Sequence, residues 1–249
     1  MTRPSHPEGE HAAERDSAKG RFMGSIARTR VKVCGITRVP DGLAACAAGV
    51  DAIGLVFWGG TPRVVDLRRA REIADALPPF VTRVGLFVDP SPAEVEAVLA
   101  AVPLDTLQFH GAEDPALCRS FSRPYLKAVH VREGVDLVEY ASLYADAAGL
   151  IFDTYAPGDL PGGTGKSFDW SRLTPALQAR LPAPVILSGG LTVDNVAAAI
   201  RAVHPWAVDV SSGVEERDAS GTTRRGLKDA ARIAAFIDGV RNADDRPSL

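Results

Sequence analysis

Residues 185–214 read VILSGGLTVDNVAAAIRAVHPWAVDVSSGV. A short apolar run, Val185–Leu187, leads into a glycine turn, an alanine-rich amphipathic stretch and a second apolar run, Ala207–Val210. This order predicts a strand, a helix and a second strand, which is the repeating unit of parallel α/β folds. Each apolar run ends in small residues, SGG in one case and SSG in the other, so backbone N–H groups there can approach an anion closely.

The same unit recurs along the chain from residue 30 onward. Apolar runs predict eight strands, at 31–34, 52–57, 81–88, 106–109, 125–129, 149–152, 185–187 and 207–210. Amphipathic stretches predict helices near 41–48, 66–76, 92–101, 114–121, 134–143, 170–180, 192–203 and 226–240. Asp66, Ser91 and Thr192 are residue types that favour helix starts, and Ser91 is followed by Pro92.

Eight such units within ~220 residues favour an α/β fold of the closed (β/α)8 type, the TIM barrel, for which about 250 residues is typical. An open doubly wound sheet is the alternative. However, no G-x-G-x-x-G turn follows the first run, and small residues follow the seventh and eighth runs, where barrels usually bind phosphate. We predict one barrel domain over residues 29–241, a disordered tail over 1–28, a second tail over 242–249, and a mobile lid loop over 153–168.

Composition excludes several classes of protein. The 249 residues are 46% hydrophobic and 24% charged, which excludes fibres, wholly disordered chains and disulfide scaffolds. The net charge of -3 provides no basic field for nucleic acid or an anionic membrane. Cys34, Cys46 and Cys118 lack metal-ligand spacing, which suggests a reducing cytoplasm, and no apolar run reaches the ~20 residues of a membrane span. We also expect residues 1–22, which precede Met23, to be dispensable.

Two side chains at strand ends suggest proton-transfer chemistry. Cys34 ends the first run and Asp153 follows the sixth, so the barrel would place them on opposite sides of its mouth. A base and an acid on opposite sides of a sugar are what an isomerisation requires. The alternative for a single cysteine is an inert buried residue, and we keep that interpretation for Cys46 and Cys118, which lie within predicted helices.

The loops after the seventh and eighth runs form a candidate phosphate cup. Its small residues are Gly189, Gly190, Ser211, Ser212 and Gly213. One glycine turn alone would be weak evidence, but these two lie on neighbouring strands, and the helix after the seventh strand would direct its positive dipole end toward the bound anion.

Two charged residues are predicted inside the barrel. Lys32 and Cys34 are two apart on one strand, so their side chains share a face. Asp209 and Ser211 have the same relation on the eighth strand, which a closed barrel places beside the first. We expect a buried Lys32–Asp209 ion pair as structural support, with Lys32 favouring the thiolate of Cys34.

Several motifs, in one order, resemble the phosphoribosylanthranilate isomerase family from about residue 31 to 237. They are KVCGIT (32–37), GLVF (54–57) with PR (62–63), VGLFV (84–88), LQFHG (107–111), GGTG (162–165) with FDW (168–170), LSGGL (187–191) and VDVSSGVE (208–215). Together they are more specific than any one of them.

The resemblance implies an aldose–ketose isomerase, an intramolecular oxidoreductase of tryptophan biosynthesis. The reaction is the Amadori rearrangement of N-(5-phosphoribosyl)anthranilate to 1-(2-carboxyphenylamino)-1-deoxy-D-ribulose 5-phosphate, without cofactor or metal. By position, Asp153 would be the general acid at the furanose ring oxygen and Cys34 the general base at C2. Arg63 would bind the anthranilate carboxylate and His110 would line the substrate site. The partner is a phosphosugar, and the chain is expected to be a monomer or homodimer.

Other functions fit the motifs less well. A ribulose-phosphate epimerase would need histidine and carboxylate metal ligands at several strand ends, where only His110 qualifies. A histidine-pathway isomerase would use paired aspartates. A barrel retired to a scaffold role would not need Cys34, Asp153 and a complete phosphate cup. A copy serving secondary metabolism would carry the same residues.

Overall fold

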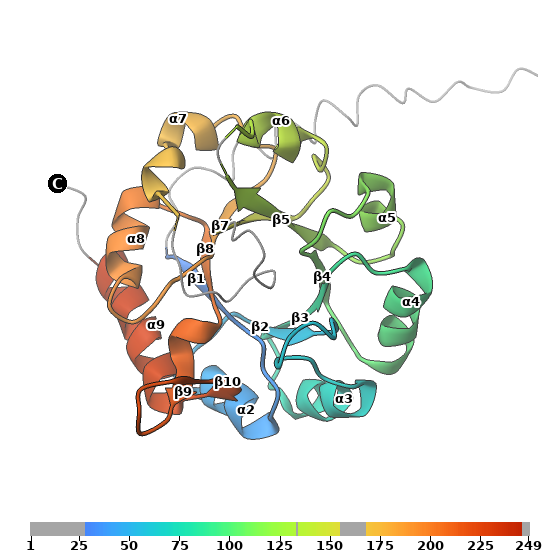
Figure 1. The fold of residues 1–249 in the computed structure, drawn as a ribbon, viewed down its shortest axis with the longest axis vertical. Coiled ribbons are helices and arrows are strands. Elements are labelled where there is room, and N and C mark those ends of the chain that lie inside the picture. Colours follow the sequence, from blue (N-terminus) through green and yellow to red (C-terminus); the bar gives the residue numbers. More distant parts are fainter. Residues whose placement is uncertain (1–27, 133, 155–167, 246–249) are drawn as a thin grey trace, which may run out of the picture.

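The eight predicted strands form a closed parallel barrel. In this computed structural model, which describes residues 28–132, 134–154 and 168–245, each strand pairs with the next and β8 closes on β1. The strands are β1 Arg30–Cys34, β2 Ala52–Val56, β3 Thr82–Phe87, β4 Thr106–Phe109, β5 Tyr125–Val131, β6 Gly149–Thr154, β7 Val185–Leu187 and β8 Ala207–Val210. Figure 1 looks into this ring, with the helices outside it. The predicted barrel is therefore confirmed.

The helices cover the outer face of the barrel. They are α2 Val39–Ala48, α3 Leu67–Ala76, α4 Pro92–Ala101, α5 Pro115–Arg119, α6 Leu137–Ser142, α7 Pro175–Gln178, α8 Val196–Val203 and α9 Ala230–Asp244, with 3-10 turns η1 Trp170–Arg172 and η2 Ser212–Val214. Asp66 caps α3, and Ser91 forms a reciprocal capping box with Glu94 at the start of α4, as predicted. Since α9 ends at Asp244, ordered structure continues three residues past the predicted boundary at 241.

Three helix predictions are wrong in detail, and one of them is 226–240, whose first residues lie in a strand. The stretch 170–180 is divided into η1 and α7, because the ring of Pro175 restricts the preceding Thr174 to extended backbone. Thr192 does not start α8. That helix follows Asn195, whose side chain accepts a hydrogen bond from the Thr192 N–H and donates one to the Gly190 carbonyl, closing a turn in between.

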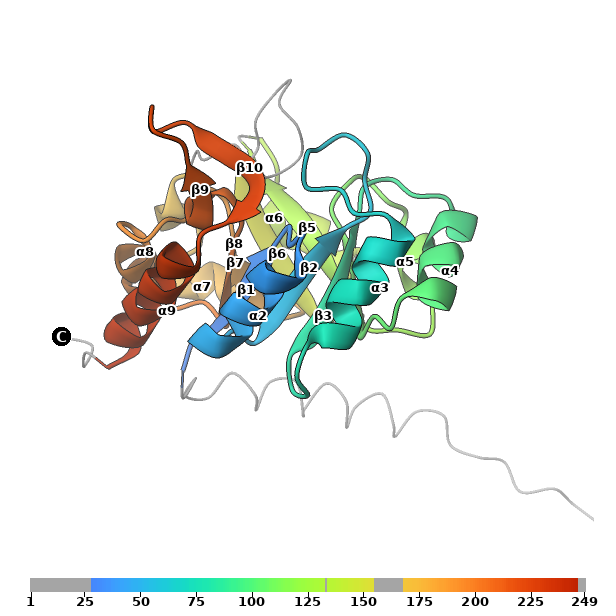
Figure 2. The same cartoon turned by 90° about the horizontal axis from the view of Figure 1, so that it is seen from below.

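A small antiparallel hairpin after β8 was not predicted. It consists of β9 Glu215–Arg217 and β10 Thr223–Lys228, so residues 226–228 lie in a strand where a helix was expected. The Asp218 carboxylate accepts hydrogen bonds from the N–H groups of Ser220 and Thr222 and shapes the turn. Figure 2 shows the hairpin projecting beyond the barrel strands. Its charged sequence lacks the apolar alternation of a buried strand, which is why periodicity did not reveal it.

Most of the apolar core lies between the strands and the helices, while the barrel interior is mixed. Ile151, Ile186 and Ala207 form a small apolar interior cluster. Cys34, Val56 and Leu86 form another, at the carboxyl ends of their strands. Within the described residues, no helix combines the length and the apolar character needed to cross a membrane. The predicted tail over 1–28 lies outside the described residues except for Arg28, and the predicted lid is outside them between residues 155 and 167.

A buried ion pair fastens the loop after β4. The Lys127 Nζ lies 2.7 Å from Glu113 Oε2, and neither side chain is exposed. Lys127 also donates to the Gly111 carbonyl, and Glu113 accepts from the Gly111 N–H. Burial raises the pKa of Glu113, but the charge and hydrogen bond of Lys127 outweigh it, so the pKa lies below its usual range. The Glu113 carboxylate is therefore charged at neutral pH, and its contacts with Lys127 and Gly111 hold the loop that begins with His110.

Replacing Lys127 with Met should destabilise the fold by about 3–5 kcal/mol at neutral pH, because it leaves the Glu113 carboxylate buried and unpaired. Since the folded-state pKa of Glu113 is depressed, the pair's contribution is present above the unfolded pKa and is lost as pH falls through the folded value. The difference from wild type in urea unfolding should therefore shrink toward acid pH. Arg71→Met, which breaks the exposed Arg71–Asp75 pair, is the control, and equal stability of both variants would contradict the assignment.

Candidate active site

One cavity opens at the carboxyl ends of the barrel strands and contains most of the predicted site. It is lined by Cys34, Val56, Trp58, Thr61, Arg63, Leu86, Gln108, His110, Asp153, Ser188, Asp209 and Ser211. Because parallel strands point the same way around the ring, residues from seven strands and their loops meet here although they are far apart in sequence.

Cys34 is the last residue of β1 and packs against a glycine. It pairs in register with Gly54 on β2, and a β-carbon built on Gly54 would lie 2.7 Å from the Cys34 sulfur. Burial raises the pKa of the Cys34 thiol, and the charges of Lys32 and Lys228 offset this only in part. The free protein therefore holds Cys34 as a thiol at neutral pH.

The expected contact between Lys32 and Asp209 is present. The two residues pair in register on β1 and β8, and Nζ lies 2.9 Å from Oδ1 with both side chains buried. Burial lowers the pKa of Lys32, but the charges and hydrogen bonds of Asp209 and Cys34 together outweigh burial and raise the net pKa, so the ammonium is charged. That charge acts on Cys34 from below, since Nζ and the sulfur both lie over Gly54.

Neutralising Lys32 should therefore move the pH profile of Cys34 alkylation to higher pH. In a Cys46→Ser/Cys118→Ser background, the rate of iodoacetamide modification reports Cys34 alone. Lys32→Met removes a charge that lowers the thiol pKa, while Lys32→Arg keeps the charge and is the control. Superimposable profiles for the Met variant and the parent would show that Lys32 does not act on the thiol.

Asp153 lies within β6 and not after it, because the strand continues to Thr154. Its carboxylate accepts a hydrogen bond of 2.8 Å from the Thr154 N–H, and His110 Nε2 lies 3.2 Å from Oδ2. A β-carbon on Gly189, which has φ +82°, would lie 2.8 Å from Oδ1. Only glycine fits there, so the turn after β7 packs directly against the carboxylate.

His110, the first residue after β4, lies beside Asp153 and also contacts a side chain of β4. Gln108 Nε2 lies 3.0 Å from His110 Nδ1, and both side chains are buried. If the amide donates to Nδ1, the imidazole proton is on Nε2, which lies near the Asp153 carboxylate but makes no hydrogen bond with any described residue. Gln108 was not predicted, although its position two residues before His110 places it on the same strand face.

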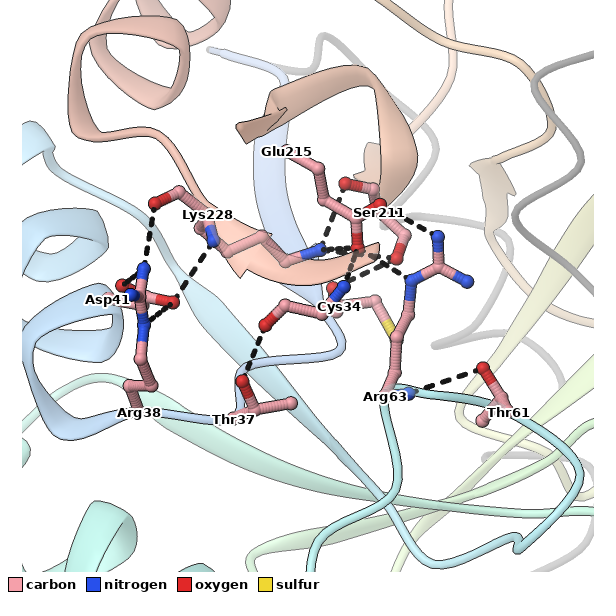
Figure 3. Close-up of polar contacts among 10 residues, drawn as sticks. Cys34, Thr37, Arg38, Asp41, Thr61, Arg63, Ser211, Glu215 and Lys228 are labelled. Atoms are coloured by element: carbon pink, nitrogen blue, oxygen red, sulfur yellow. Dashed lines mark hydrogen bonds and ion pairs between the residues drawn. The ribbon is translucent and has the colours of Figure 1, made fainter. Parts of the chain in front are cut away.

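Arg63 follows β2 and is buried, unlike most arginines of this chain. Its Nε and Nη2 donate to the two carboxylate oxygens of Glu215, at 2.7 and 2.9 Å (Figure 3). Gly35, at φ +75°, leaves room for the arginine stem, because a β-carbon there would lie 2.7 Å from Arg63 Cδ. Glu215 belongs to the VDVSSGVE motif, but its pairing with Arg63 was not predicted.

The two loops of the predicted phosphate cup meet. A β-carbon on Gly213 would collide with the Leu191 carbonyl, so the loops after β7 and β8 are packed together. Gly189 and Gly190 both have positive φ, and Ser212 and Gly213 lie in η2. Of the predicted cup residues only Ser211 lines the cavity, and its hydroxyl donates to the Cys34 carbonyl at 3.1 Å. Phosphate binding by the loops stays a prediction.

A second cavity lies elsewhere, between β1 and α9. Its lining includes Thr29, Gly49, Val240 and Asp244 but none of the predicted catalytic groups. No cluster of three or more histidine, cysteine or acidic side chains suited to a metal ion occurs among residues 28–132, 134–154 and 168–245.

Comparisons with known proteins agree on one family. The family model described as N-(5'phosphoribosyl)anthranilate (PRA) isomerase matches residues 31–239. The N-(5'-phosphoribosyl)anthranilate isomerase of Alcanivorax borkumensis is 57% identical over 212 residues, which cover 85% of this chain and 95% of that protein.

Solved structures agree with the sequence matches. The phosphoribosyl anthranilate isomerase of Thermotoga maritima superposes with a TM-score of 0.76 at 38% identity, covering 86% of this chain and 99% of that one. A phosphoribosyl anthranilate isomerase in complex with reduced 1-(o-carboxyphenylamino)-1-deoxyribulose 5-phosphate superposes with a TM-score of 0.73 at 37% identity and the same coverage.

Proposed function

The chain belongs to the N-(5'-phosphoribosyl)anthranilate isomerase family and is an aldose–ketose isomerase of tryptophan biosynthesis, and we propose that Asp153 and Cys34 are the acid and base of its reaction. The observation that carries this proposal is that both groups line one cavity with Arg63 at the carboxyl ends of the strands. A sugar bound there would have an acid, a base and a cation around it.

The first step opens the sugar ring. Asp153, in its protonated form, gives a proton to the furanose ring oxygen of N-(5-phosphoribosyl)anthranilate, and the bond between C1 and that oxygen breaks. The nitrogen lone pair forms a C1=N double bond, so the product is a cationic Schiff base. The contacts of the carboxyl group with His110 and the Thr154 N–H keep it in one orientation for this transfer.

The second step removes the proton at C2. The Cys34 thiol first loses its proton to solvent, and the resulting thiolate takes the C2 proton. The electron pair moves through C1 to the nitrogen, giving a neutral enolamine. The C2 hydroxyl then loses its proton and C1 gains one, which gives the ketone. Substrate and product therefore contain the same atoms. Burial raises the resting thiol pKa, and the cationic Schiff base beside the sulfur would lower it when a base is needed.

Binding contacts complete the proposal. Arg63 binds the anthranilate carboxylate, a task suited to a planar guanidinium, and His110 lines the sugar site. Gly189, Gly190, Ser211, Ser212 and Gly213 hold the phosphate through the loops after β7 and β8. The ligand is thus a phosphosugar.

Cellular context follows from the pathway. We propose that the chain works in the cytoplasm, without a nucleic-acid or membrane partner, as a monomer or homodimer. Light scattering of the purified chain distinguishes these two assembly states.

Direct turnover tests the proposed function. The purified full chain is supplied with enzymatically generated N-(5-phosphoribosyl)anthranilate, and loss of substrate fluorescence is followed while the product is identified by mass and chromatography. The expected result is conversion to the carboxyphenylamino deoxyribulose phosphate without added cofactor. A folded chain that leaves the substrate unchanged would overturn the assignment.

A further inference from the structure

A residue outside the cavity holds the guanidinium of Arg63. Glu215, the first residue of β9, is almost fully buried and accepts hydrogen bonds from Nε and Nη2 of Arg63 (Figure 3). This side-on arrangement uses two of the five N–H donors of the guanidinium. Nη1 donates to none of the described residues, so none of them occupies the opposite edge of the group, which is the edge that a ligand carboxylate can approach.

Glu215 is itself held by the second strand of the hairpin. Its Oε1 atom accepts from the Lys228 ammonium at 3.2 Å and from the Gly226 N–H at 2.9 Å. Burial raises the pKa of Glu215, but the hydrogen bonds of Arg63 and the charge of Lys228 outweigh it and keep the pKa low. The carboxylate is therefore charged and has little freedom to rotate.

Lys228 connects the hairpin to the catalytic strands. Its Nζ atom is buried and donates to the Ser211 carbonyl at 2.9 Å, and the Ser211 hydroxyl donates to the Cys34 carbonyl at 3.1 Å. The Lys228 N–H donates to Asp41 Oδ2 at 3.0 Å, at the start of α2. The Lys228 side chain thus contacts Ser211 after β8 and Glu215 in β9, and the Lys228 backbone is bound to Asp41 of α2.

The hairpin also rests directly on the loops after β1 and β2. The Thr37 hydroxyl donates to the Gly226 carbonyl at 2.5 Å. Gly226 has φ +88°, and a β-carbon there would lie 2.9 Å from the carbonyl oxygen of Pro62, the residue before Arg63. The position of β10 is therefore coupled to the backbone that carries Arg63.

We propose that Glu215 and Lys228 are positioning residues that hold Arg63 with its free edge toward the cavity and so set the selectivity for substrates bearing a carboxylate on the aromatic ring. This proposal rests on the proposed function, in which Arg63 binds that carboxylate. Arg63 lines the cavity, whereas Glu215 and Lys228 do not, so the two hairpin residues act through Arg63.

Charge alone would predict the opposite effect of losing Glu215. Removal of its negative charge leaves Arg63 and Lys228, two cations, and an anionic ligand would then bind more tightly. However, burial already lowers the pKa of Lys228, and Glu215 is the main group that opposes this. Without Glu215 the pKa of Lys228 would fall further, which works against the gain in positive charge around Arg63, and we expect the lost orientation of Arg63 to decide the outcome.

Two ligands separate carboxylate recognition from general binding. One is reduced 1-(o-carboxyphenylamino)-1-deoxyribulose 5-phosphate, and the other is the same molecule with a plain phenyl ring. Calorimetry gives the Kd of each for wild type, Arg63→Met, Glu215→Gln and Lys228→Met. We expect Glu215→Gln to raise the Kd of the carboxylated ligand by roughly ten- to a hundredfold, the range of a charge-assisted hydrogen bond. The Kd of the phenyl ligand should stay nearly unchanged.

The matched control is the neighbouring residue on the same strand. Glu216 accepts hydrogen bonds from Arg38 and Arg224 and does not contact Arg63, so Glu216→Gln should leave the ratio of the two Kd values unchanged. Glu215→Asp keeps the charge but is one methylene shorter. It should reduce the preference for the carboxylated ligand over the phenyl ligand, as Glu215→Gln does. It is measured instead if Glu215→Gln or Lys228→Met fails to fold.

The outcomes distinguish the positioning role of Glu215 and Lys228 from the proposed binding of the substrate carboxylate by Arg63. If Arg63→Met leaves the ratio unchanged, Arg63 does not bind the carboxylate and both proposals fail. If Arg63→Met removes the preference for the carboxylated ligand but the Glu215 variants retain this preference, only the positioning role fails. Equal weakening of both ligands, or tighter binding of the carboxylated ligand by Glu215→Gln, would also overturn it.

Discussion

Asp153→Asn should lower kcat by roughly 10²–10⁴-fold, the usual contribution of a positioned general acid, while KM changes little. The amide keeps the size of the carboxyl group and can still face His110 and the Thr154 N–H, so the cavity keeps its shape. It cannot release a proton to the ring oxygen, so the furanose remains closed. Steady-state fluorescence assays at several substrate concentrations separate kcat from KM.

Gln108→Leu provides a comparison for Asp153→Asn. It removes the contact of the amide with His110 Nδ1 without touching the Asp153 carboxyl group, so it should cost far less activity. An Asp153→Asn enzyme as fast as wild type would move the acid role to another group.

Cys34→Ser should also reduce kcat by roughly 10²–10⁴-fold, because a hydroxyl is a much weaker proton acceptor than a thiolate near neutral pH. The substitution is nearly isosteric, and the pocket formed by Gly54 and Lys32 remains. Substrate affinity should therefore change little. Binding of the reduced product analogue and single-turnover rates measure the two effects separately.

Cys46→Ser is the matched control for Cys34→Ser. Cys46 lies in α2 on the outer side of the barrel, packed against the core, and does not line the cavity. Its substitution should leave turnover unchanged. Undiminished activity of Cys34→Ser would exclude the thiol as the base.

Periodicity predicted the barrel because each strand and helix carries its own local signal. The runs Thr106–Phe109, Val185–Leu187 and Ala207–Val210 were predicted to the residue, since a polar residue or a proline lies close to each of their ends. The α8 start was misplaced because a side-chain turn at Asn195 replaces the helix there. The β9–β10 hairpin was missed because its residues are selected by contacts with Arg63 and the barrel rim and not by strand alternation.

The site was predictable where strand order alone determines neighbours. Lys32 and Asp209 could be paired because barrel closure places β1 beside β8. The partners of Arg63 could not, since Glu215 lies 152 residues away and reaches it through an unpredicted hairpin. Likewise, the approach of Gly189 to Asp153 depends on how the β7 turn folds back over β6, which no local pattern encodes.

The hydrogen isotope effect at C2 tests most directly whether Cys34 is the base and Asp153 the acid. Substrate deuterated at C2 is compared with ordinary substrate in wild type, Cys34→Ser and Asp153→Asn. If Cys34 breaks the C2–H bond, its loss makes that step rate-limiting, and Cys34→Ser should show a large primary isotope effect. If Asp153 opens the ring first, Asp153→Asn should be limited by ring opening and show none. The reverse pattern, or the same isotope effect in both variants, would contradict the assignment.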